Sequence, residues 1–191
     1  DVTNALVWAA DDDAIDIDQA YSGTITNAIV VAFSGTDHCL EIAGPEGNAL
    51  GSFTLSNVSA KGVDDEIADF RDGARGTVSG AYFFNFVAPS FDTNGDEEGG
   101  TGEGDVELDD DLSSAYYLAG DLDFANWQFT LDVAATLDDV IADKADNSTS
   151  GLDADIVNFA SNVDAGSQTQ GADPTVFGWT FTSVNGALSG F

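Results

Sequence analysis

The chain has 191 residues, of which 43% are hydrophobic, so it is long enough to bury the core of one domain. Its 35 acidic and 4 basic residues give a net charge of −31, and this balance excludes nucleic acid as a partner because basic residues must displace its counterions. The charge also disfavours anionic membrane surfaces, and no stretch approaches the roughly 18 apolar residues of a spanning helix, so we expect no membrane insertion.

The first predicted element is a phrase that repeats along the chain. Residues 2–9, VTNALVWA, return as ITNAIVVA at residues 25–32, and weaker copies follow. A fixed period is typical of stacked architectures. Aligning the copies places one residue of each in a common column, which consists of Asn4, Asn27, Asn57, Gly80 and Asn126. Successive residues of this column are 23, 30, 23 and 46 positions apart.

The composition of the repeat indicates strands. It is rich in β-branched and aromatic residues, and Gly, Asn, Asp and Ser separate the short apolar runs. Three strands of about 4–5 residues and three tight bends use about 23 residues. We therefore predict an all-β fold, a right-handed parallel β-helix with turns of about 23 residues, a long acidic loop and a C-terminal, partly helical cap.

The same offsets predict which side chains share a face. Apolar and polar columns alternate, as expected for strands with one buried face. In the outward column that contains Arg71, we interpret the arginine as neutralising its acidic neighbours. The predicted columns are Ile17, Leu40 and Phe70 (inward), Asp18, Glu41 and Arg71 (outward), and Asp16, Cys39 and Asp69 (outward).

Composition divides this single domain into three parts. Residues 1–91 carry the regular turns, and residues 92–115 form a predicted acidic loop without apolar periodicity. Residues 116–191 contain the last turns and the C-terminal cap. The predicted elements of the cap are short helices at 133–143 and 152–159 and a strand at 176–181.

Two acidic clusters are candidate calcium sites. One is in the acidic loop, where oxygen ligands stand at alternate positions, and the other is a column of equivalent bends in successive turns. Calcium takes about 6–8 oxygen ligands, which such clusters supply in part. A solvated acidic surface without metal stays open as the alternative. The candidate ligands are Asp92, Asn94, Asp96 and Glu98 in the loop, and Asp12 and Asp65 at the bend.

The N-terminal phrase is a candidate assembly interface. It begins within the repeat pattern, without a preceding proline or lysine to block strand pairing. We predict that Val2, Asn4, Leu6 and Trp8 contact either the upstream part of a longer surface protein or a second copy. End-to-end stacking of copies does not close on itself, so it predicts a filament or sheath.

Enzymatic chemistry is not predicted. The chain lacks the Gly-His-Gly and Arg-Ile-Lys elements of polygalacturonase-like hydrolases, and Arg71 and Arg75 are the candidate bases for a lyase. His38 and Cys39 are strand neighbours that point to opposite faces, so we interpret both as structural. The aromatics at 82–86 are interpreted as core stacking, and a carbohydrate-binding or carbohydrate-degrading module is the alternative function.

Four segments, at residues 10–25, 70–79, 120–124 and 179–188, carry a family likeness. They resemble exported surface proteins of Bacteroidota and other, mostly marine, bacteria. The resemblance implies a right-handed parallel β-helix, an extracellular or cell-surface location, and a match to the C-terminal part of a longer protein; it implies no site residues. With the charge of −31, which cations must screen, it leads us to predict a structural or adhesive surface protein stabilised by calcium.

Overall fold

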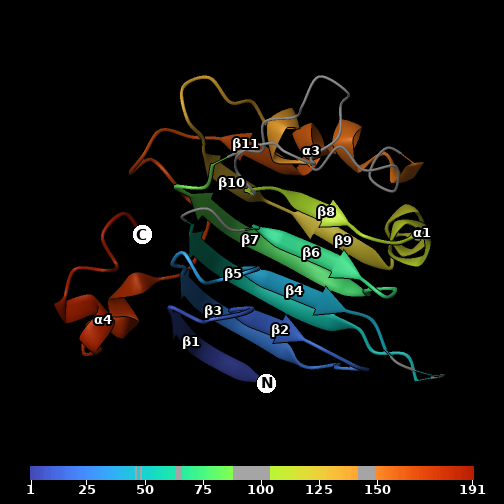
Figure 1. Ribbon diagram of the computed structural model, residues 1–191, viewed down its shortest axis with the longest axis horizontal. Helices are drawn as coiled ribbons and strands as arrows, with labels where there is room; N and C mark the ends of the chain where they lie inside the picture. The colour runs from blue at the N-terminus through green and yellow to red at the C-terminus, as the bar shows by residue number, and fades with distance from the viewer. Residues whose placement is uncertain (46, 48, 63–65, 88–103, 142–148) are drawn as a thin grey trace.

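The computed structural model describes residues 1–45, 47, 49–62, 66–87, 104–141 and 149–191, and its strands form two parallel sheets (Figure 1). The long sheet runs in the order β1 (Val2–Trp8), β3 (Thr24–Val31), β5 (Phe53–Lys61), β7 (Gly76–Phe84), β10 (Trp127–Thr130) and β11 (Ala160–Asn162), with β9 (Leu122–Ala125) also paired to β7. The short sheet consists of β2 (Ile15–Ile17), β4 (Leu40–Ala43), β6 (Ala68–Arg71) and β8 (Val106–Leu108). The helices are α1 (Asp111–Ala119), η1 (Asp138–Val140), α3 (Leu152–Phe159), η2 (Pro174–Phe177) and α4 (Phe181–Val184).

The prediction of an all-β, closed β-helix is wrong. Helix α1 separates β8 from β9 and α3 separates β10 from β11, so the described residues form a mixed α/β fold of two parallel sheets, without a closed solenoid. Helix α1 begins inside the predicted acidic loop, and its caps explain why. Asp110 accepts hydrogen bonds from the backbone N–H groups of Leu112 and Ser113, and Gly120 ends the helix in the left-handed conformation.

The register of the long sheet follows the sequence repeat. Val2 pairs with Ile25, Ile25 with Leu55, and Leu55 with Val78, which are steps of 23, 30 and 23 residues. Val78 then pairs with Phe124, a step of 46 residues. The spacing that defines the repeat is therefore confirmed as the spacing between parallel strand partners.

The aligning column of the repeat is a column of left-handed backbone. All five of its residues have a positive φ, between 53° and 64°. Asparagine and glycine are the residues that adopt this region most readily, which explains their recurrence at this position. Two neighbouring members also bond to each other, because the Asn27 side-chain amide donates to Asn4 Oδ1 at 2.6 Å.

Residues 169–173, which we call the strap, cross the long sheet next to this column of left-handed residues. Its consecutive backbone N–H groups donate to acceptors on four strands, at distances of 2.6 to 3.0 Å. Beyond the strap, Phe177 packs against Ile29 and Val31 on the outer side of the long sheet. The acceptors, in strap order, belong to Gln128, Gly80, Ser59 and Asn27.

Replacing Asn27 by alanine is expected to lower the free energy of unfolding by about 2–3 kcal/mol. Alanine pays about 1–2 kcal/mol for the left-handed conformation, and the hydrogen bonds to Asp173 and Asn4 are lost. Asn27→Gly is the matched control, since it loses the same hydrogen bonds but keeps the conformational freedom. Urea unfolding should rank the wild type above Asn27→Gly and Asn27→Gly above Asn27→Ala; equal losses would contradict the conformational argument.

The predicted columns of the short sheet are wrong. Ile15 pairs with Leu40 and Ile42 with Phe70, which are steps of 25 and 28 residues instead of 23 and 30. The connection from β3 to β4 spans residues 32–39, whereas that from β1 to β2 spans residues 9–14. The longer connection shifts β4 by two residues relative to the repeat, so offsets from the long sheet do not apply to the short one.

Helix α3 covers one end of the two sheets, at the top of Figure 1, while β1 and β2 lie at the opposite end. Leu152 and Ile156 of α3 are fully buried against the core. The predicted helix at 152–159 is thus confirmed, whereas the strand predicted at 176–181 is replaced by parts of η2 and α4. None of the helices described combines the length and apolar character needed to cross a bilayer.

Candidate functional site

Most of the predicted calcium ligands lie outside the described residues: Asp65 in one bend, and Asp92, Asn94, Asp96 and Glu98 in the acidic loop. Asp12 is described, and its side chain is exposed. Its backbone carbonyl accepts a hydrogen bond from the N–H of Asp37. The carboxylates that gather in the described structure are others.

These carboxylates form an acidic row across the short sheet. Asp16 pairs with Glu41, Glu41 with Asp69, and Asp69 with Glu107. Burial increases along the row, from the exposed Asp16 to Asp69 and Glu107, which are 1% and 4% exposed. Like charges on neighbouring strands repel, and nearby cations or protonation of a carboxylate relieve that repulsion. The sequence contained these residues but misaligned them, because of the shifted register of β4.

Arg71 neutralises part of this row. Its Nε and Nη2 atoms both lie 2.5 Å from Asp69 Oδ2, and Nη2 lies 2.9 Å from Glu41 Oε2. Of the two acidic neighbours predicted for Arg71, Glu41 is confirmed as an ion-pair partner, whereas among the described residues the second ion-pair partner is Asp69 and not Asp18. The second oxygen of Asp69, Oδ1, is buried and has no hydrogen-bond partner within the described part of the chain. Burial raises the pKa of Asp69 to about 6 although Arg71 opposes the shift.

His38 supplies the second positive charge. It is 6% exposed, and its Nδ1 lies 2.5 Å from Asp13 Oδ1 and its Nε2 3.2 Å from Glu66 Oε2. Burial by itself lowers the pKa of His38, but the contacts with Glu66 and Asp13 outweigh it and raise the pKa to about 10. The imidazole is therefore a cation at neutral pH, fixed between strands by carboxylates.

Two groups of side chains bring potential metal-ligand atoms within 4.8 Å of one another. The first contains His38 with Asp13 and Asp37, but a protonated imidazole has no lone pair for a metal. The second group contains carboxylates alone, from β6, β8 and the residue that follows β8. It consists of Asp69, Glu107 and Asp109.

The predicted assembly residues lie on β1, an edge strand of the long sheet. Val2 and Trp8 are 45% and 49% exposed, whereas Leu6 packs beside the cluster that includes Phe177. The Trp8 ring lies 5.8 Å from the ring of Phe181 in α4, which is itself largely exposed. The structure therefore joins β1 and the C-terminal segment into one partly apolar surface.

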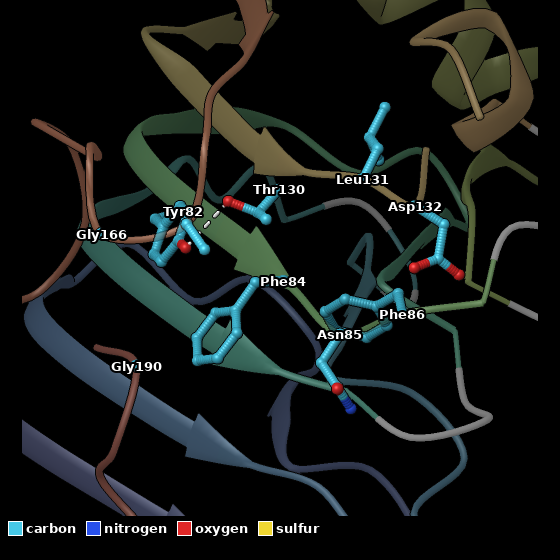
Figure 2. A pocket seen from close by; sticks show the side chains of 10 residues that line it. Tyr82, Phe84, Asn85, Phe86, Thr130, Leu131, Asp132, Gly166 and Gly190 are labelled. Atoms are coloured by element: carbon cyan, nitrogen blue, oxygen red, sulfur yellow. Dashed lines mark hydrogen bonds between the residues drawn. The ribbon is translucent and has the colours of Figure 1, made fainter. Parts of the chain in front are cut away.

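A pocket of about 260 Å³ lies beside β7 and β10 (Figure 2). The Tyr82 ring stacks on Phe84, and its hydroxyl forms a hydrogen bond with Thr130 at 3.0 Å. Phe191 packs edge-on against Phe84. Among the described residues that line the pocket, Asp132 is the one carboxylate, whereas glycoside hydrolysis uses a pair. The aromatics at 82–86 serve mainly to pack the structure.

Comparison of the chain with protein-family models, curated proteins and solved structures finds no match. The likeness to exported surface proteins consequently rests on the sequence motifs, and the functional argument rests on the geometry of this fold.

Proposed function

We propose that the chain is a structural module of an extracellular or cell-surface protein and that it associates with a second copy through the β1 end. The observation that carries the proposal is a neutral, partly apolar surface at an unpaired sheet edge in a protein of net charge −31. Residues 2–10 and 174–191 contain no charged side chain. Two copies can meet there without bringing side-chain carboxylates together.

The backbone of β1 supports the same proposal. One side of β1 pairs with β3, and the described residues offer no strand to its other side. An exposed edge of this kind accepts a further strand through main-chain hydrogen bonds. Val2 and Trp8 on the strand, and Phe181, whose ring contacts Trp8, supply exposed apolar area around the edge.

The two ends of the molecule differ, and this difference bears on the symmetry of association. Helix α3 covers the far end with Leu152 and Ile156, so head-to-tail stacking would have to displace it. If β1 contacts β1 of a second copy, both copies use the same surface, and the pair has two-fold symmetry with no surface left for a third copy. This arrangement favours a dimer over the filament predicted from sequence.

Association should depend on concentration and salt. The wild-type chain is expected to form dimers more readily in 1 M NaCl than in dilute buffer, because about 1 M salt screens charges beyond roughly 3 Å. Trp8→Asp should weaken dimerisation at least about tenfold, since a charge replaces an aromatic side chain that the dimer contact would bury. Sedimentation equilibrium over a wide range of concentrations measures both effects.

Val133→Asp is the matched control, because it places the same charge on a fully exposed valine beyond β10. It should dimerise like the wild type. A monomer at every concentration in high salt would contradict the proposal. Open filaments in electron micrographs would show head-to-tail stacking and would contradict the two-fold arrangement.

A further inference from the structure

We propose that Asp69, Glu107 and Asp109 form a calcium site on the short sheet, distinct from the loop and bend predicted from sequence. Asp69 and Glu107 are direct partners on β6 and β8. Asp109 follows β8, and its N–H donates to the carbonyl of Phe70, which holds it beside β6. The site thus stands on paired strands, whose register fixes the spacing of its ligands.

The distances fit a single ion. One carboxylate oxygen from each residue lies within 4.8 Å of the other two. Two oxygens that each lie about 2.4 Å from one calcium ion are separated by no more than about 4.8 Å. Asp109 is exposed, so solvent can reach the ion and complete the roughly 6–8 ligands that calcium takes.

A second observation, independent of the acidic composition, points to a missing ligand. Asp69 is 1% exposed, and its Oδ1 atom is buried without a hydrogen-bond partner among the residues that the structure describes, while Arg71 occupies Oδ2. Buried polar atoms in native proteins are nearly always satisfied, so this oxygen of a cluster residue calls for a partner. A cation bound by the three carboxylates would supply one.

The ligand chemistry agrees with a hard divalent ion, because all three side chains are carboxylates. Calcium is favoured over magnesium because magnesium demands near-ideal octahedral geometry and gives up its water reluctantly. A mixed set of buried and exposed carboxylates on two strands and a bend suits the more flexible coordination of calcium.

The experiment titrates calcium into the chelator-treated 191-residue chain at constant ionic strength, by calorimetry and by thermal unfolding. Millimolar calcium should raise the Tm of the wild type by about 5–10 °C if it exceeds Kd about 100-fold. Asp109→Asn, at an exposed position that tolerates substitution, should weaken this binding at least about tenfold, and Asp69→Asn should abolish it. Asp18→Asn removes an exposed charge outside the cluster and should bind like the wild type.

Calcium that binds elsewhere in the chain would still bind Asp69→Asn and Asp109→Asn. If both variants kept the wild-type number of sites and the same rise in Tm, the assignment would be overturned. It would also be overturned if Asp69→Asn raised the Tm and the wild type bound no calcium, since Asp69 would then be a neutral buried acid. Loss of binding in these two variants, with Asp18→Asn unaffected, supports the site.

Discussion

Replacing Trp127 by alanine is expected to lower the free energy of unfolding by about 3–5 kcal/mol, the usual cost of deleting a large buried aromatic side chain. Trp127 is 1% exposed, and its ring packs at 4.8 Å from Phe124 and at 5.3 Å from Phe83. Its indole N–H also donates to the carbonyl of Val78 at 3.0 Å, so alanine leaves both a cavity and a buried acceptor without its donor.

Two other variants separate these contributions. Trp127→Phe keeps a ring but loses the hydrogen bond, and should cost about 1–3 kcal/mol. Trp179→Ala makes the same substitution at a residue that is 84% exposed and should change stability by less than about 0.5 kcal/mol. Urea unfolding measures all three. A small loss for Trp127→Ala would show that the aromatic cluster between the sheets does not form the core.

Raising the pH from 6.5 to 10 is expected to remove about 2–4 kcal/mol of stability through His38. The folded-state pKa of His38 is about 10, above its unfolded value of 6.5. A group whose pKa is raised by folding stabilises the native state fully below the unfolded pKa and loses that contribution as the pH rises through the folded pKa. One pKa unit corresponds to about 1.4 kcal/mol, and solvent screening reduces the sum.

The measurement compares the wild type with His38→Gln in urea at several pH values. His38 is the single histidine of the chain, so titrating groups that the two proteins share affect both alike and cancel in the difference. The gap between the two proteins should be largest near pH 6 and should shrink as the pH approaches 10. A gap that stays constant would mean that the His38 charge does not stabilise the fold.

The sequence predicts the long sheet better than the short one, and the reason is physical. The asparagine column repeats because each strand needs a left-handed residue at one point, so its spacing reports the strand pairing directly. The short sheet has no such marker, and two extra residues between β3 and β4 are invisible in a repeat aligned on the long sheet.

The same error hid the candidate site. Asp16, Glu41 and Asp69 were visible as acidic residues on predicted strands, but the assumed offsets assigned Glu41 to a different column. Glu107 and Asp109 lay in a range predicted as loop, although Asp110 and Gly120 are cap residues that mark a helix between them. These two caps predict a helix that starts inside the range predicted as loop, so the predicted loop is too long.

The strap has a consequence for the order in which the protein folds. Neighbouring strands β1, β3, β5 and β7 join residues 23 or 30 positions apart, whereas Asp173 of the strap reaches Asn27 across 146 positions. Closing the longer loop costs more chain entropy, so we expect the strands to pair first and the strap to dock afterwards. During synthesis, the hydrogen bonds between the strap and the long sheet can therefore form only after the four earlier strands have emerged.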